Sequence, residues 1–326
     1  PATQNPRVIN YMDEIIAFVS TLVDKGFAYV SEGDVYFRVA KSNNYAKLAN
    51  KTLEDLEIGA SGRTDAETER KENPLDFALW KAAKEGEVSW DSPWGPGRPG
   101  WHIECSVMAT EILGDTIDIH GGGADLEFPH HTNEIAQSEA KTGKTFANYW
   151  MHNGFVNVDN EKMSKSLGNF VTVHDMLQTV DGQVLRFFLA TQQYRKPINF
   201  TEKAIHDAEV NLKYLKNTHS LPLTEQVNQA ELQTYLDAFQ EAMDDDFNTA
   251  NGVTVLFDMA KWINSGNYDQ TVKDAFEKML QVFGIVFEEE VLDEDIEKLI
   301  EERQAARANK DFATADRIRD ELAAQG

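Results

Sequence analysis

The sequence has one cysteine, Cys105, among its 326 residues. A single cysteine cannot form an internal disulfide, which is typical of proteins kept in a reducing compartment. No run of about 18 apolar residues occurs, so no membrane-spanning helix is expected. The first residues do not combine a basic and an apolar segment, so no signal peptide is predicted. We therefore expect a cytoplasmic protein without a membrane partner.

Basic residues are also scarce, with 31 Lys and Arg against 55 Asp and Glu and a net charge of −24. This excess of negative charge argues against a broad nucleic-acid-binding surface. A large net charge more often serves to keep a protein soluble. Any nucleic acid would have to bind a local basic patch, for which Arg186, Arg195 and Lys196 are candidates. The length predicts two to four domains.

The hydrophobic pattern changes along the chain. Apolar spacing predicts a helix over residues 7–25 and a hairpin formed by residues 27–30 and 35–39. After a turn-rich connector at 93–100, the order helix, strand, glycine turn, helix, strand resembles half of a doubly wound sheet. From Thr172 onward the pattern is almost wholly helical. Helices are expected at about 173–192, 201–217, 230–244, 249–264, 269–284, 293–307 and 309–324.

The loop Lys162-Met163-Ser164-Lys165-Ser166, called the signature loop below, carries two lysines three residues apart. Lysine is a mobile point charge that suits a triphosphate whose charge moves during reaction. Taken alone, however, the same five residues are equally consistent with an ordinary solvated loop.

Two further groups of residues could carry chemistry. His130 and Glu134 are four apart, which places them on one helix face, and with Cys105 they offer ligands that suit zinc. Alone, these residues would more often be a buried thiol and a surface pair. Gly121-Gly122-Gly123 follows a predicted strand, where glycines let a backbone approach a ligand or simply form a turn.

These features occur in an ordered series with several other motifs. The series contains Asn73–Lys81, Gly100–Ser106, Asp118–Leu126, Phe128–Glu134, Tyr149–Gly154, the signature loop and Ala242–Thr249. It resembles the class I aminoacyl-tRNA synthetases, and the bacterial cysteinyl-tRNA synthetases in particular. The resemblance implies an α/β plus all-α protein: the second half of a Rossmann-like nucleotide-binding fold with an insert, followed by a helical tRNA-binding region.

The resemblance also implies a division of the chain. The expected domains are a connective insert (1–92), the second half of the catalytic domain (93–160), the signature loop and stem-contact region (161–210), a helical bundle on the anticodon side (211–290) and the start of a carboxy-terminal tRNA-binding region (291–326).

The activity implied by the resemblance is ATP-dependent activation of L-cysteine and its transfer to tRNA(Cys). ATP enters with Mg²⁺ as a substrate. Zn²⁺, held by Cys105, His130 and Glu134, would select the substrate thiolate, because a metal binds a thiolate far better than a neutral hydroxyl.

The resemblance assigns further roles residue by residue. Lys165, with Lys162, would stabilise the transition state as pyrophosphate leaves. The nucleotide would also contact Gly121, Gly122, Gly123, Asp125, Ser164 and Ser166. The amino-acid pocket would be formed by Trp101, His102, His120 and His152.

The sequence departs from the family pattern in two respects. It contains no His-x-Gly-His element, and the upstream cysteine that serves as a fourth zinc ligand in the family is absent. We therefore expect a fragment without the amino-terminal half of the enzyme, inactive alone and with uncertain zinc occupancy. Two alternatives stay open: a cysteine ligase of mycothiol-type biosynthesis acting on a small-molecule amine, and a non-catalytic helical interaction protein.

Overall fold

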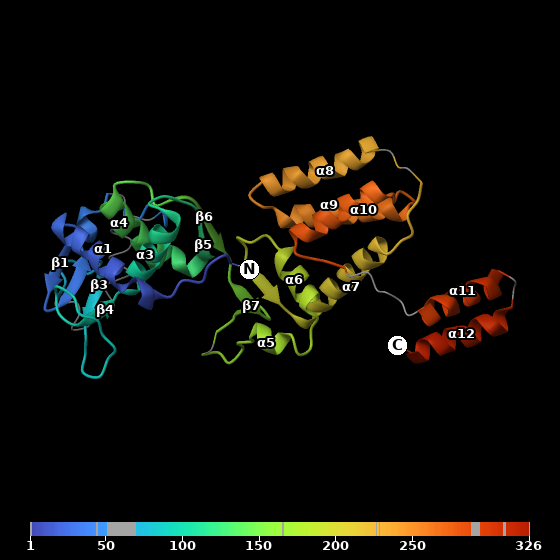
Figure 1. Ribbon diagram of the computed structural model, residues 1–326, viewed down its shortest axis with the longest axis horizontal. Coiled ribbons are helices and arrows are strands. Elements are labelled where there is room, and N and C mark those ends of the chain that lie inside the picture. Colours follow the sequence, from blue (N-terminus) through green and yellow to red (C-terminus); the bar gives the residue numbers. More distant parts are fainter. Residues whose placement is uncertain are drawn as a thin grey trace. The chain divides into compact units, whose positions relative to one another are not determined.

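The computed structural model describes residues 2–43, 45–50, 70–164, 166–225, 227, 229–287, 294–308 and 311–325 (Figure 1). Two compact units make up the chain. Unit 1 comprises residues 1–178 and 192–204, and unit 2 comprises residues 179–191 and 205–326. In the described part of the chain, no helix combines the length and apolar character needed to cross a membrane.

Unit 1 begins with a helix packed on an antiparallel sheet. The predicted first helix is confirmed as a 3₁₀ turn, Val8–Tyr11, that continues into α1 (Met12–Asp24). The predicted hairpin is also confirmed, with β1 (Ala28–Ser31) paired to β2 (Asp34–Phe37). The sheet has the order β1-β2-β3-β4 and is completed by β3 (Phe77–Ala82) and β4 (Gly97–Pro99). A 3₁₀ turn, Val39–Lys41, follows β2. The helix-like Leu53, Leu56 and Ile58 lie outside the described residues.

The core of unit 1 anchors the two helices that carry the candidate metal ligands. α3 (Trp101–Leu113) contributes the buried Ile103 and Val107 to the cluster formed by α1 and the sheet. α4 (Thr132–Thr142) contributes Ala136 to the same cluster, and both helices contact α1. Burial of these side chains fixes the positions of α3 and α4, because removing apolar surface from water is the main stabilising term in folding.

A parallel strand pair lies beside these helices. β5 (Ile117–Gly123) pairs in parallel with β6 (Ala147–Asn153), and α4 forms the crossover between them, as the sequence predicts. Gly143 ends α4 with a φ of 71°, a left-handed conformation that glycine adopts without strain. The three glycines at the end of β5 pair with Met151, His152 and Asn153 at the end of β6. Side chains from both strands therefore meet at one edge of the sheet.

Two short helical turns connect β5 to α4. Ala124–Leu126 is a 3₁₀ turn, and Glu127–His131 is a π-helical turn with an extended residue at Phe128. The break separates His130 and Glu134 into two successive elements, although the sequence pattern predicts one helix from Pro129.

A third sheet, of three strands, presents the signature loop. Its order is β8-β7-β9, with β7 (Val156–Val158) antiparallel to β8 (Glu161–Lys162) and parallel to β9 (Ile198–Phe200). Because β8 ends at Lys162, the rest of the loop leaves directly from a hydrogen-bonded hairpin.

The expectation of one helix over 173–192 is wrong. The chain instead forms α5 (Val173–Met176) and α6 (Gly182–Ala190), because the Asp181 carboxylate accepts hydrogen bonds from the amides of Gln183 and Val184 and starts a new helix. The other predicted helices are confirmed close to their expected bounds. They are α7 (Glu202–His219), α8 (Gln229–Asp244), α9 (Thr249–Asn264), α10 (Gln270–Val282), α11 (Glu294–Ala308) and α12 (Phe312–Gln325). Within unit 2, α8 packs on α9, and α11 on α12.

Candidate active site

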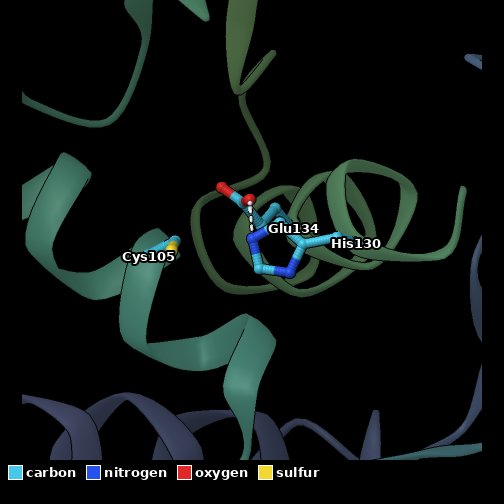
Figure 2. A group of neighbouring side chains, drawn as sticks. All are labelled: Cys105, His130 and Glu134. Atoms are coloured by element: carbon cyan, nitrogen blue, oxygen red, sulfur yellow. Dashed lines mark ion pairs between the residues drawn. The ribbon is translucent and has the colours of Figure 1, made fainter. Parts of the chain in front are cut away.

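Cys105, His130 and Glu134 come together as the sequence predicts. Their ligand atoms lie within 4.8 Å of one another, with Cys105 on α3 facing the other two residues (Figure 2). His130 Nε2 lies 2.9 Å from Glu134 Oε1, and the Glu134 side chain is fully buried. A thiol, an imidazole and a carboxylate at this spacing form a donor set of the kind that binds zinc.

The contact between His130 and Glu134 lacks hydrogen-bond geometry. Although the two atoms are 2.9 Å apart, Glu134 Oε1 has no hydrogen-bond partner among the described residues. On the other side of the ring, His130 Nδ1 lies 2.8 Å from His102 Nδ1, so one of these nitrogens donates and the other accepts. When His130 donates, its Nε2 lone pair faces Glu134 Oε1. In that tautomer a cation bound by both atoms would remove the conflict between these lone pairs, and the donor types present fit a metal ion.

Burial and neighbouring charges shift the pKa values of Cys105 and Glu134. Burial raises the pKa of the Cys105 thiol to about 12, and the nearby Glu134 and Glu104 carboxylates add to this effect. Burial also acts to raise the pKa of Glu134, but contacts with His120 and His130 hold it below its usual value. Glu134 is therefore an anion near neutral pH, whereas Cys105 must lose a proton before it can bind a metal.

Glu134 also belongs to a second cluster of polar side chains, which contains His120, His131 and His152. His120 Nε2 lies 2.8 Å from Glu134 Oε2, and His131 Nδ1 lies 2.7 Å from His152 Nε2. Trp150 stacks on His120 with ring centroids 4.6 Å apart. The ligand atoms of His120, His131 and Glu134 also lie within 4.8 Å of one another. His131 thus groups with the histidines of the two strands, and not with Cys105 and His130.

His102, His131 and His152 form a largely uncharged wall. Burial lowers the pKa of His102 to about 4, with His130 contributing, and burial and His120 lower the pKa of His131 to about 4. Burial also lowers the pKa of His152. The 61% exposed Trp101 lies at the edge of this wall, with its ring centroid 4.6 Å from that of His130. Neutral imidazoles can donate and accept hydrogen bonds without adding charge beside the donor set.

The glycine turn is crowded by its own neighbours. A Cβ added at Gly122 would lie 2.9 Å from His131 Cε1, and one added at Gly123 would lie 2.5 Å from Asp125 Oδ1. The buried His131 ring makes a larger residue at Gly122 unfavourable, whereas the Asp125 side chain could rotate away from one at Gly123. Asp125 lies in the 3₁₀ turn after β5, at the strand edge where doubly wound sheets bind ligands.

The signature loop is held by its own hydrogen bonds. The Asn169 side chain accepts from the Ser164 amide at 2.9 Å and donates to the Lys162 carbonyl at 3.2 Å. The hydroxyls of Ser164 and Ser166 lie 3.1 Å apart. Lys162 Nζ lies 4.4 Å from the centre of the Phe155 ring, a cation–π contact. Lys165 lies outside the described residues.

The predicted nucleotide residues form two separate groups. In the described part of the chain, no hydrogen bond, ion pair or ring contact joins Lys162, Ser164 or Ser166 to Gly121–Gly123 or Asp125. The structure also reveals residues that the sequence analysis does not single out: Gln137, Trp150, Phe155 and Asn169. Asn169 lies three residues after the signature loop, so its position alone could have identified it, whereas Gln137 carries no such signal.

Comparisons with known proteins identify the fold and the family of this chain. Residues 1–210 match the family of tRNA synthetases class I (C) catalytic domain, residues 238–288 match the DALR domain, and residues 289–326 match the cysteinyl-tRNA ligase anticodon binding domain. Two solved structures of Mycobacterium tuberculosis methionyl-tRNA synthetase share the fold. The complex with methionyl-adenylate has a TM-score of 0.57 at 15% identity, over 86% of this chain and 72% of that one. The free form has a TM-score of 0.52 at 12% identity, over 87% and 72%. The fold is therefore that of a class I aminoacyl-tRNA synthetase.

Sequence relatives define the family more narrowly. The chain is 95% identical to the cysteine--tRNA ligase of Streptococcus thermophilus strain CNRZ 1066, 82% identical to that of Streptococcus pyogenes serotype M6 and 81% identical to that of Streptococcus agalactiae serotype III. Each match covers the whole chain and 73% of the relative. The chain belongs to the cysteine--tRNA ligase family, an enzyme family of ligases. Neither alternative left open by the sequence is supported by these matches.

Proposed function

We propose that this chain carries the metal and signature-loop parts of an enzyme that activates L-cysteine with ATP and Mg²⁺ and transfers it to tRNA(Cys). The observation that carries the proposal is the meeting of Cys105, His130 and Glu134 at one point, inside a chain of this family. Because the Cys105 thiol must stay reduced to serve as a ligand, we place the protein in the cytoplasm.

The donor set accounts for substrate choice. Cys105, His130 and Glu134 would hold Zn²⁺, and three protein donors leave at least one tetrahedral position for a further ligand. A bound zinc ion would supply affinity for a sulfur that can ionise and little affinity for a hydroxyl that stays protonated. Cysteine and serine differ at only this atom, so hydrogen bonds alone would separate them poorly. Glu134 would bring an anionic carboxylate, which His120 Nε2 orients through the other oxygen, Oε2, at 2.8 Å.

The wall beside the donor set would hold the rest of the amino acid. Trp101, His102, His120 and His152 offer ring faces and ring nitrogens around it, and burial favours the neutral form of His102 and His152. Neutral rings suit this task because a positive charge there would repel the α-ammonium group of the substrate.

The nucleotide would lie between the two groups described above. Gly121, Gly122 and Gly123 present bare backbone at the strand edge, and Asp125 can accept hydrogen bonds from the ribose or base. Lys162, Ser164 and Ser166 would meet the phosphates, with Lys165 assigned by sequence alone. Their charge and hydroxyl groups would act mainly on the leaving pyrophosphate, where negative charge develops.

For the chain as a whole, we propose the domain division 1–92, 93–160, 161–210, 211–290 and 291–326. The carboxy-terminal part of this division is supported by the family matches at 238–288 and 289–326. The helical regions would contact tRNA(Cys), with the anticodon read by the last of them.

A competition between cysteine and serine tests the proposal. In an enzyme of the relatives' full length, ATP–pyrophosphate exchange and tRNA charging are measured with each amino acid. Cys105→Ser should reduce the preference for cysteine at least tenfold, as expected for loss of a metal ligand. Lys162→Ala is the matched control: it should slow activation of both amino acids and leave their ratio unchanged. If Cys105→Ser keeps the wild-type ratio, the metal does not select the substrate. Activation followed by transfer to a small amine, with no charging of tRNA, would favour the mycothiol-type alternative.

A further inference from the structure

Gln137 forms a buried bridge between the two helices that carry the donor set. Its side chain is fully buried on α4. Its Nε2 donates to the main-chain carbonyl of His102 at 2.7 Å and to the Ser106 hydroxyl at 2.7 Å, both on α3. These two hydrogen bonds are called the Gln137 bridge below.

The orientation of the amide is fixed by its partners. The His102 carbonyl can only accept a hydrogen bond, so the Gln137 atom facing it must be the nitrogen. Gln137 Oε1 therefore faces away, and this buried atom has no hydrogen-bond partner among the described residues. An unpaired buried carbonyl is costly. An apolar side chain of the same volume would avoid this cost, so stability alone does not explain a glutamine here.

The bridge spans the candidate ligands. Glu134 and Gln137 are three residues apart on α4 and face the same helix. On α3, Cys105 lies between His102 and Ser106, the two residues that the bridge holds. The Ser106 hydroxyl also donates to the Glu134 carbonyl at 3.4 Å. The bridge thus sets the distance between the helix bearing the thiol and the helix bearing the carboxylate.

His102 is held at two points, one from α4 and one from the π-helical turn that precedes it. Its carbonyl accepts from Gln137, and its ring Nδ1 lies 2.8 Å from His130 Nδ1. A shift of the His102 backbone would therefore move the ring that orients His130 as well as the neighbouring Cys105. One amide can influence the sulfur and the imidazole of the donor set together.

We propose that Gln137 is a positioning residue for the metal: it acts through His102 and Ser106 to hold Cys105 at ligand distance from His130 and Glu134. This inference rests on the proposed metal site. Residues that orient metal ligands typically contribute 10–100-fold in metal affinity.

A metal titration of the full 326-residue chain tests the inference. Co²⁺ is the probe, because thiolate-to-cobalt absorption reports Cys105, the only cysteine of the sequence. Gln137→Met keeps the volume and removes the donor. We expect its dissociation constant for Co²⁺ to rise 10–100-fold, while the thermal midpoint of the metal-free chain stays the same or rises, because the unpaired Oε1 is gone.

Two variants complete the test. Ser138→Ala is the matched control: Ser138 is the next buried residue on α4, its hydroxyl likewise lacks a partner among the described residues, and it makes no side-chain bond to α3. Its Co²⁺ affinity should equal that of the wild type. Ser106→Ala removes one of the two bridge bonds and should weaken Co²⁺ binding less than Gln137→Met does.

The possible failures are distinguishable. A Gln137→Met chain that binds Co²⁺ within twofold of the wild type, with the thiolate band intact, overturns the positioning role and leaves the metal site standing. A lower thermal midpoint with unchanged Co²⁺ affinity also overturns it, since the glutamine then serves stability only. A wild-type chain without any thiolate band overturns the metal site, and the inference with it.

Discussion

The ammonium group of Lys162 lies 4.4 Å from the centre of the Phe155 ring, and this is the one charge contact of Lys162 in the described part of the chain. A cation–π contact at a partly exposed site contributes about 0.5–1 kcal/mol. Hydrogen bonds from a charged donor contribute about 1.5–3 kcal/mol, so a triphosphate can draw the lysine away from the ring. The Lys162 ammonium group is thus held against the Phe155 ring and forms no ion pair with a carboxylate in the described part of the chain.

Asn169 should control the shape of the signature loop. Asn169→Ala removes the bonds to the Ser164 amide and the Lys162 carbonyl, so we expect adenylation to slow by about tenfold, equivalent to about 1.4 kcal/mol. Asn169→Asp keeps the acceptor and loses the donor, and should lie between the wild type and Asn169→Ala. Pre-steady-state adenylate formation in an enzyme of the relatives' full length measures both variants. Equal rates for all three proteins would contradict the role.

The two loop lysines should act on the transition state. Lys165→Ala, assigned from the sequence pattern, should lower the adenylation rate by about a hundredfold, near 3 kcal/mol, while cysteine affinity changes little. Lys162→Ala should show a smaller loss. Stopped-flow adenylation with varied cysteine separates rate from affinity. A change confined to cysteine affinity would mean that the loop does not clamp phosphate.

Gly154 should be intolerant of any side chain. An added Cβ would lie 2.4 Å from the carbonyl carbon and oxygen of Lys196, which are backbone atoms that cannot step aside. Gly154→Ala should therefore destabilise unit 1 by about 1–3 kcal/mol. Thermal unfolding followed by tryptophan fluorescence measures the loss. Asn153→Ala, at the exposed neighbouring residue, should stay within about 0.5 kcal/mol, and similar behaviour of the two variants would contradict the packing argument.

The ion pair between Arg38 and Glu72 should make a small pH-dependent contribution. The Arg38 guanidinium, 2.6 Å from the carboxylate, holds the pKa of Glu72 below its usual value. A depressed carboxylate pKa stabilises the fold above the unfolded pKa of about 4.3, and this contribution disappears as pH falls through the folded pKa. Because Glu72 is half exposed, the effect is screened to about 0.5 kcal/mol.

Glu72→Gln should therefore be slightly less stable than the wild type at pH 7, and this deficit should be smaller at pH 3. Urea unfolding at both pH values measures this difference. Glu111→Gln is the control, since this α3 residue has no ion pair in the described part of the chain. A Glu72→Gln deficit of the same size at pH 3 and pH 7 would assign the effect to something other than the ion pair.

The sequence alone predicts the strongly periodic elements, because helical spacing and turns are local signals. It also predicts the donor set, through the match to a family pattern. α1 and the helices from α7 onward follow the predicted spacing, and the β1–β2 hairpin has a turn with Gly33 at a φ of 87°. Cys105, His130 and Glu134 could be predicted because their spacing matches a family pattern. The break between α5 and α6 was missed because the Asp181 cap competes with an unbroken apolar pattern.

Other features depend on distant contacts that no local pattern reveals. β9 is three residues long and forms only by pairing with β7. The Gln137 bridge joins residues 31 and 35 positions apart. The contact of Phe155 with Lys162 depends on the β7–β8 hairpin. Such residues become visible only when the tertiary structure places their partners beside them.

X-ray absorption at the zinc K-edge of the 326-residue chain tests the central claim most directly. We expect one sulfur at about 2.3 Å from zinc and nitrogen or oxygen atoms at about 2.0–2.2 Å, with the sulfur absent in Cys105→Ser. Addition of L-cysteine should add a second sulfur to the wild-type spectrum, and addition of L-serine should not. A zinc spectrum without sulfur, or one identical in the wild type and Cys105→Ser, would contradict the claim that Cys105, His130 and Glu134 hold the metal that selects cysteine.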